Sequence, residues 1–198
     1  MQALIIIDAQ NEFSWDGLRP VPGHEAILSV IRRHVENARE NGNPIAWIRH
    51  HNLPSESPAF VPGSWGAEFS PGFGPTGLSK EVEFHKNVYG AFTGTRLGDW
   101  LSKLDITEIM ITGFYTHGCV STTSREAIMA GLEVVLDPEA TGACDISHPQ
   151  LGRMTAEEVR RSALLQLVNM GAHISAHPKS ISKTDRQADY TQKDTTQN

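Results

Sequence analysis

The sequence predicts a single α/β domain in which a mostly parallel, Rossmann-like sheet lies between two layers of helices, giving three αβα layers. Short runs such as 3–7 and 45–48 are apolar throughout, which is typical of strands buried on both faces. These runs alternate with segments of helical periodicity, and such alternation favours parallel strands joined by right-handed crossovers. A length of 198 residues with 39% hydrophobic content is sufficient for one well-packed core.

The first three expected elements are a strand, a helix and a second strand. The strand at 3–7 is followed directly by Asp8. A helix begins near Glu25 and ends at the Asn-Gly pair at 41–42, because these residues commonly end helices. Its apolar residues at helical spacing are Ile27, Ile31, Val35 and Ala38. The second strand is expected at 45–48.

A long loop follows this second strand. Residues 52–79 are rich in proline, glycine and serine and show little periodicity. A loop of this length inside a compact domain is usually functional, so we expect a lid or a wall of a substrate pocket. A short strand is expected at 83–86, ending in Lys86. The helix after it is indicated by Leu97, Trp100, Leu101 and Leu104.

The second half of the chain repeats the alternation. A strand at 109–112 leads through glycines into a helix that stops at Gly131, and another strand is expected at 134–136. The residues at 155–158 form a capping box that opens a helix, and a last strand is expected at 172–175. We expect the domain to occupy residues 1–181, with a polar C-terminal tail at 182–198 of the composition usual for disordered segments.

Composition excludes several classes of function. The formal net charge of −6 gives no reason to expect nucleic acid or an anionic membrane as a partner. The two cysteines, Cys119 and Cys144, cannot form a disulfide framework and suit a reducing compartment. Neither a signal peptide nor a membrane span is indicated. We therefore expect a cytoplasmic protein, and we assign no role to Cys144.

Cys119 is the strongest candidate for a catalytic residue. It follows the strand at 109–112 and a glycine-containing turn, at the start of a helix, where unpaired backbone N–H groups can bind an oxyanion and lower the pKa of a thiol. Asp8 and Lys86 stand out with it, since each lies at the end of an expected strand. Together the three residues supply a nucleophile, a base and a cation, as acyl transfer through a thioester requires.

Several motifs carry a resemblance to a known family. These are Asp8-Ala-Gln10 with Phe13, Lys86 with Ala91-Phe92 and Thr95-Arg-Leu97, Gly113-x-x-Thr116-x-x-Cys119-Val120, and Gly131 through Asp137. In order and spacing the chain resembles the isochorismatase-like cysteine hydrolases over roughly residues 3–181. Nicotinamidases and N-carbamoylsarcosine amidohydrolase belong to the same superfamily.

The resemblance implies a mechanism and an assembly. Cys119 would attack a carbonyl carbon, Asp8 would take the thiol proton and pass it to the leaving amine, and Lys86 would balance their charge. The oxyanion would lie between the backbone N–H groups of Cys119 and Tyr115, with a cis peptide bond between Phe114 and Tyr115. The presence of Cys119 favours amide over vinyl ether chemistry. Relatives assemble as dimers or larger, so we expect a homo-oligomer, either a dimer or a tetramer.

The expected partner is a small amide, ureido or carbamoyl substrate. We expect its pocket to be formed by a polar residue near Asp8 and by aromatic residues, some of them in polar loops. The expected substrate-binding residues are Gln10, Phe13, Trp15, Trp65, Tyr89 and Tyr115, and Phe60 is expected in the pocket wall as well.

Two other functions remain open at this stage. One is vinyl ether hydrolysis of the isochorismatase type. The other is a binding module on the same fold, although an intact Asp8, Lys86 and Cys119 argues against it. An inert thiol of high pKa at Cys119 would favour the binding module.

Three further patterns are weaker. Cys119 and Arg125 form C-x5-R, the phosphatase signature, but the segment between them lacks the glycines of a phosphate cradle. The match to G-x-G-x-x-G at 72–77 contains a proline and opens no helix. His50 and His51 follow the second strand, where nicotinamidases carry an Asp-x-His metal site, but the aspartate is missing. We therefore predict no metal and no other cofactor.

Overall fold

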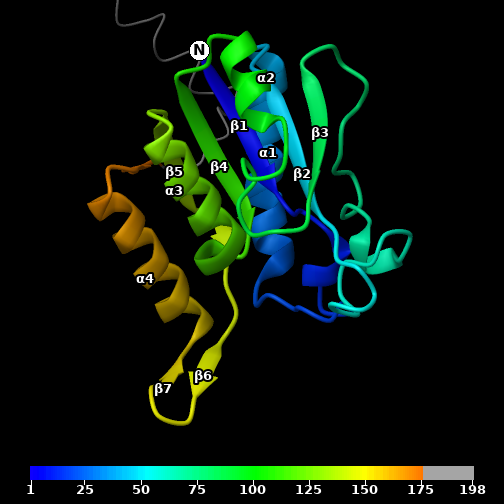
Figure 1. Ribbon diagram of the computed structural model, residues 1–198, viewed down its shortest axis with the longest axis vertical. Helices are drawn as coiled ribbons and strands as arrows, with labels where there is room; N and C mark the ends of the chain where they lie inside the picture. The colour runs from blue at the N-terminus through cyan, green and yellow to red at the C-terminus, as the bar shows by residue number, and fades with distance from the viewer. Residues whose placement is uncertain (176–198) are drawn as a thin grey trace, which may run out of the picture.

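The computed structural model describes residues 1–175 of the chain (Figure 1). The expected tail at 182–198 and the expected end of the domain at 181 lie outside the described residues. The helices and strands follow in the order β1 (Gln2–Ile7), α1 (His24–Glu40), β2 (Ile45–His50), β3 (Glu81–Lys86), α2 (Leu97–Lys103), β4 (Glu108–Phe114), α3 (Ser121–Met129), β5 (Glu133–Gly142), β6 (Ile146–His148), β7 (Gly152–Met154), α4 (Ala156–Asn169) and β8 (His173–Ile174).

The central sheet confirms the predicted fold class. Its six strands lie in the order β3-β2-β1-β4-β5-β8, and every neighbouring pair is parallel. Helix α1 covers one face, and α2, α3 and α4 cover the other (Figure 1). Because all the strands run the same way, their carboxyl ends meet at one edge of the sheet, which is where ligands bind in such folds.

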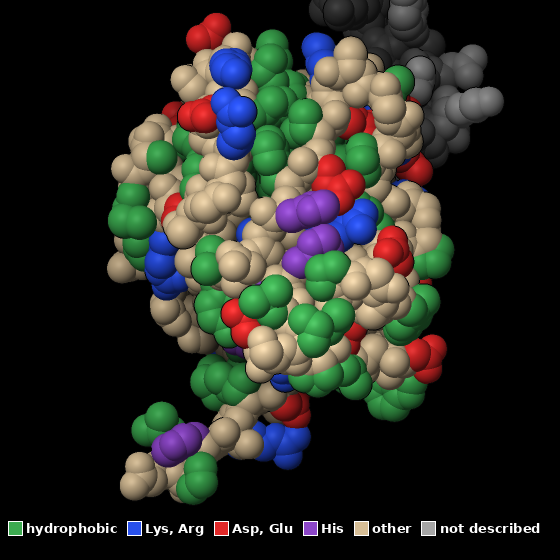
Figure 2. Space-filling model, turned by 45° about the vertical axis from the view of Figure 1, so that its right-hand side comes forward, with side chains coloured by type: hydrophobic (Ala, Val, Ile, Leu, Met, Phe, Trp, Pro, Cys, Tyr) green, Lys and Arg blue, Asp and Glu red, His purple; other side chains and the backbone are tan. Residues whose placement is uncertain are grey.

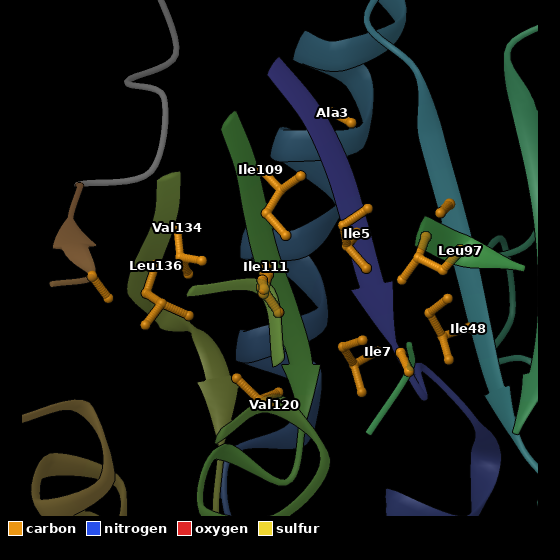
Figure 3. Packing of buried hydrophobic residues seen from close by; sticks show 14 of the residues in the cluster. Ala3, Ile5, Ile7, Ile48, Leu97, Ile109, Ile111, Val120, Val134 and Leu136 are labelled. Carbon is orange, nitrogen blue, oxygen red and sulfur yellow. The ribbon is translucent and has the colours of Figure 1, made fainter. Parts of the chain in front are cut away.

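Two hydrophobic cores sandwich the sheet. Along β1, Ala3, Ile5 and Ile7 face one core, whereas Leu4 and Ile6 face the other, because successive side chains of a strand point to opposite faces. Figure 3 shows the first core, in which side chains of β1, β4 and β5 point away from α1. Burial on both faces explains why these strands read as continuous apolar runs.

Two features near β5 differ from the sequence prediction. Strand β5 extends to Gly142, beyond the expected 134–136, because pairing with β4 resumes after an irregularity and joins Gly113 to Thr141. The β6–β7 hairpin was not predicted, since its strands are three residues each and largely exposed. It projects from the body of the molecule as an arm (Figure 2).

Gly113 shows why β4 needs a glycine near its end. Its φ is +110°, and a Cβ atom there would lie 1.8 Å from the carbonyl oxygen of Ile7. A side chain would therefore collide with β1, and only glycine adopts this conformation readily. The close approach brings the ends of β1 and β4 together, and both lead into the candidate site.

The loop at 52–79 leaves the carboxyl edge of the sheet after β2 and returns to its amino edge, where β3 begins parallel to β2. It contains one short 3-10 turn, Trp65–Ala67. A β-bridge between Gln10 and Phe69 holds it against the segment after β1. None of the helices within residues 1–175 has the length and apolar character that spanning a membrane requires.

Candidate active site

Three elements bring Asp8, Lys86 and Cys119 together at the carboxyl edge. Asp8 follows β1, Lys86 ends β3, and Cys119 lies in the irregular helical turn Thr116–Val120 between β4 and α3. Lys86 Nζ lies 2.8 Å from Asp8 Oδ2 and 3.2 Å from Cys119 Sγ. The side chains of Asp8 and Lys86 are fully buried. The structure thus assembles the three residues that the sequence singled out.

The charges of this cluster compensate one another. Burial alone would lower the pKa of Lys86, but the neighbouring Asp8 and Cys119 outweigh it and hold the pKa above its ordinary value. The lysine is therefore an ammonium ion at neutral pH. Asp8 Oδ1 is buried and accepts no hydrogen bond from the described residues, so one carboxylate oxygen is free to receive a proton.

The pKa of Cys119 is raised above its ordinary value. The prediction that its place at the start of a helix would lower this pKa is therefore wrong for the resting protein. Burial is the largest cause, the Asp8 carboxylate adds to it, and Lys86 opposes both. Cys119 is therefore a neutral thiol at rest. A neutral thiol beside a free carboxylate oxygen can still act as a nucleophile, because the carboxylate can accept the thiol proton during attack.

His50 is part of the same cluster, which the sequence interpretation missed. It is the last residue of β2 and pairs with Lys86 across the two strands. Its Nδ1 lies 3.0 Å from Lys86 Nζ, and burial, then the Lys86 charge, lowers its pKa. The signal was its position at a strand end beside a long loop, but the sequence suggested only a metal ligand there.

Three residues of this cluster are of the types that bind metal ions. Asp8, His50 and Cys119 each offer one ligand atom, and these atoms lie within 4.8 Å of one another. However, all three residues already contact the Lys86 ammonium, which occupies the space between them. His51 packs instead against His85, with ring centroids 4.5 Å apart. The arrangement does not fit a metal ion while Lys86 is charged.

A cavity of about 710 Å³ opens above the cluster. It has an aromatic and apolar wall, a polar wall from the loops after β2 and β3, and the reactive groups in its lining. The lining residues are Asp8, Phe13, Arg19, His50, Asn52, Ser57, Phe60, Asn87, Val88, Tyr89, Tyr115, His117, Gly118, Cys119 and Thr122.

The cavity is lined by Phe13, Phe60, Tyr89 and Tyr115 of the expected pocket residues, and the other three lie elsewhere. Gln10 is fully buried, and its amide bonds the backbone of His50 and the carbonyl of Ala67. Trp15 is 89% exposed and lines a smaller neighbouring cavity. Trp65 is also exposed and does not line the cavity above Cys119.

Several polar lining residues were not singled out in the sequence, including Asn52, Ser57 and His117. The only sequence signal for Asn52 and Ser57 was the long loop expected to form a pocket wall. Arg19 is exposed, and its guanidinium forms no ion pair or hydrogen bond with residues 1–175. Figure 2 shows two neighbouring histidine side chains with an acidic and a basic side chain beside them. In the structure His51 packs against His85, and Glu83 forms ion pairs with both His85 and Arg49.

The segment from Phe114 to Cys119 turns sharply. The Phe114–Tyr115 peptide bond is cis, and the Tyr115 carbonyl accepts hydrogen bonds from the backbone N–H groups of Gly118 and Val120. The Tyr115 hydroxyl donates to the Arg19 carbonyl at 2.8 Å, which fixes the ring at the cavity wall. Burial raises the pKa of this phenol, so it is neutral.

The two weak motifs do not contribute to the site. The Arg125 guanidinium binds Ser121 and Gln166, so it faces α4 instead of forming an anion cradle with Cys119. The segment 72–77 is a loop and does not line the cavity.

Known proteins resemble this chain in sequence and in structure. Residues 2–178 match the family model of the isochorismatase domain. The chain is 32% identical to the secreted isochorismatase effector of Verticillium dahliae over 72% of this chain and 73% of that protein. It is 29% identical to the nicotinamidase/pyrazinamidase of Mycobacterium tuberculosis over 85% and 98%. A crystal structure of an isochorismatase from Pseudomonas putida superposes with a TM-score of 0.82 and 28% identity, covering 89% of this chain and 88% of that one.

Proposed function

This chain belongs to the isochorismatase family of hydrolases, and on that premise we propose that it is a cysteine-dependent amidohydrolase. It cleaves the C–N bond of a small amide, ureido or carbamoyl compound through a thioester. One observation carries the proposal: the Cys119 thiol and the Asp8 carboxylate, both buried, each lie within hydrogen-bonding distance of the Lys86 ammonium at a substrate-sized cavity. The similarity to a nicotinamidase/pyrazinamidase supports amide chemistry.

The proposed reaction begins with attack of Cys119 Sγ on the substrate carbonyl carbon. Asp8 accepts the thiol proton as the C–S bond forms, and the carbonyl oxygen becomes an oxyanion near the backbone N–H groups of Tyr115 and Cys119. Collapse of this intermediate breaks the C–N bond, and Asp8 returns the proton to the leaving nitrogen. Asp8 then removes a proton from water, which hydrolyses the thioester and regenerates the thiol.

Lys86 stays charged throughout this cycle. Its ammonium stabilises the Asp8 carboxylate before the proton transfer and any negative charge on Cys119 Sγ during it, because it contacts both groups. In a site shielded from water such contacts are stronger than at a surface. Lys86 therefore has an electrostatic role and need not lose a proton.

The two other functions make different demands on the same groups. Vinyl ether hydrolysis requires a proton donor but no nucleophilic thiol, so Cys119 would have no catalytic role in that reaction. A binding module would not need the cluster at all. The raised pKa of Cys119 does not favour that module, because Asp8 can accept the thiol proton during attack.

The direct test is ammonia release from a panel of primary amides, ureido acids and N-carbamoyl compounds, with isochorismate as the competing substrate. We expect turnover with at least one C–N substrate and accumulation of an acyl-enzyme on Cys119, detected by mass spectrometry after rapid acid quench. Turnover of isochorismate alone, without a covalent adduct, would favour the vinyl ether hydrolase.

Activity should survive exhaustive dialysis against a strong chelator. The reason is that the Lys86 ammonium already contacts Asp8, His50 and Cys119, which are the ligands a metal ion would need. The measurement is the hydrolysis rate before and after dialysis, with metal content determined by mass spectrometry. Loss of activity that zinc or iron restores would show that a metal occupies this site.

We also propose that the protein is a homo-oligomer located in the cytoplasm. The β6–β7 arm and α4 support an oligomer, because they expose apolar side chains such as Leu151, Ile146 and Leu165, and such surfaces often mark interfaces. Light scattering at micromolar concentration should give a mass at least twice the 21.7 kDa of one chain. A mass near 21.7 kDa would contradict the proposal.

A further inference from the structure

We propose that His50 is a positioning residue whose Nδ1 accepts one hydrogen of the Lys86 ammonium and thereby aims the other two at Asp8 and Cys119. This inference rests on the proposed amidohydrolase function for its kinetic consequence. The contact itself is independent of any substrate.

The first argument is the number of donors and acceptors. A lysine ammonium has three hydrogens and no acceptor. Lys86 Nζ has a partner for each hydrogen: Asp8 Oδ2 at 2.8 Å, His50 Nδ1 at 3.0 Å and Cys119 Sγ at 3.2 Å. Because Lys86 is buried, no solvent-exposed acceptor competes with these three for the ammonium hydrogens. Removing the His50 acceptor would leave one buried N–H unpaired and free the ammonium to rotate.

The second argument concerns the tautomer of His50. Nδ1 can accept from Lys86 only if the ring proton is on Nε2, and His50 Nε2 lies 2.8 Å from Asn52 Oδ1. The Asn52 amide is oriented in turn, since its Nδ2 donates to the Ala59 carbonyl at 3.1 Å. An oxygen therefore faces Nε2 and accepts its proton. The neutral ring is also favoured because burial and the Lys86 charge lower the pKa of His50.

The third argument is that the imidazole is held firmly. Gln10 donates to the His50 carbonyl at 3.0 Å and accepts from the His50 N–H at 2.8 Å. The edge of the ring contacts Phe60, with centroids 5.2 Å apart. The β2–β3 register places His50 directly opposite Lys86. Precise placement of a group acting through another is what positioning requires, because small displacements of a catalytic charge cost rate.

The competing interpretation is that His50 binds substrate, since it lines the cavity. A set of substitutions separates the two. His50→Asn keeps polar atoms at the δ position, where an amide oxygen can replace Nδ1. His50→Gln moves the polar atoms to the ε position, and His50→Phe removes them. His51→Asn is the matched control, because the neighbouring His51 packs against His85 and does not line the cavity.

We expect His50→Phe and His50→Gln to lower kcat by about 10- to 100-fold with KM within about twofold of wild type, the loss typical of residues that orient catalytic groups. His50→Asn should recover most of kcat, and His51→Asn should behave as wild type. A rise in KM with unchanged kcat in the His50 variants would overturn the proposal in favour of substrate binding.

Two measurements need no substrate and so separate this inference from the proposed function. In a Cys144→Ser background, alkylation of Cys119 by iodoacetamide should require a higher pH in His50→Phe, because Lys86 lowers the pKa of this thiol and is less well aimed at it there. At a fixed pH below the pKa, the alkylation rate should fall about tenfold when the pKa of the thiol rises by about one. Lys86→Met should change the pH dependence in the same direction, and His50→Asn should leave it as in the wild type.

Long-range 1H–15N spectra of the wild-type protein give the second measurement. At pH 7 the resonances that disappear in His50→Asn should show a proton on Nε2 and none on Nδ1. A proton on Nδ1 would overturn the proposal even if the enzyme hydrolyses amides. If no amide is hydrolysed but the tautomer and the change in alkylation are as expected, the proposed function fails and the His50–Lys86 contact stands.

Discussion

Replacing Cys119 by alanine should abolish turnover, with a loss on the order of 10⁶-fold in kcat, because no other group in the cavity can form the thioester. The fold should persist. Cys119 is buried but small, and its loss removes one sulfur atom from the packing, at a cost of about 1 kcal/mol. Steady-state rates and thermal unfolding of the purified variant measure the two effects separately.

Cys144→Ala is the matched control for this prediction. It removes the other free cysteine, which is half-buried and does not line the cavity above Cys119, so activity should be retained. The acyl-enzyme adduct should disappear in Cys119→Ala and persist in Cys144→Ala. Wild-type rates in Cys119→Ala would end the thioester mechanism and revive vinyl ether hydrolysis.

Asp8→Asn should have the second largest effect, a loss of about 10²- to 10⁴-fold in kcat, because asparagine cannot accept the thiol proton. The substitution also leaves the buried Lys86 ammonium without its carboxylate, and breaking such a pair typically costs about 3–5 kcal/mol of stability. The double variant Asp8→Asn/Lys86→Met should lose less than the sum of the single losses, because the two residues act as a unit.

The reactivity of the Cys119 thiol toward an alkylating agent should increase in Asp8→Asn, although turnover decreases. The Asp8 carboxylate raises the pKa of Cys119, so its removal lowers that pKa. Alkylation of Cys119 in Asp8→Asn should then extend to lower pH than in the wild type, while turnover collapses. Alkylation that required a higher pH in Asp8→Asn would contradict the assignment of Asp8 as the neighbouring base.

The proximity of Asp8, Lys86 and Cys119 could be predicted from the sequence because of how parallel sheets are built. Asp8, Lys86 and Cys119 each follow or end an apolar run, and the carboxyl ends of parallel strands converge. Their proximity therefore required only that the runs were strands of one sheet, which the structure confirms. The capping box at Thr155 could also be predicted, because it depends only on residues close together in the sequence, and the structure confirms it.

Properties that depend on how deeply a side chain is buried, or on the course of a loop, could not be predicted from the sequence. Gln10 is polar and adjacent to Asp8, but only the fold shows that its amide holds the backbone of His50. Trp15 and Trp65 lie in polar loops whose course the sequence does not determine. The raised pKa of Cys119 follows from burial that no residue pattern specifies, and it overrides the effect expected of a helix start.

The order of strands around the cluster has a consequence for folding. Lys86, His50, Asp8 and Cys119 end or follow the adjacent strands β3, β2, β1 and β4, respectively. Along the chain, Lys86 is separated from Asp8 by 78 positions, from His50 by 36 and from Cys119 by 33. Such non-local contacts form late and together, because each requires the closure of a long loop. In a denaturant titration, hydrolysis should disappear in the same cooperative transition as the central sheet, so that the enzyme's rate reports whether the whole sheet is intact.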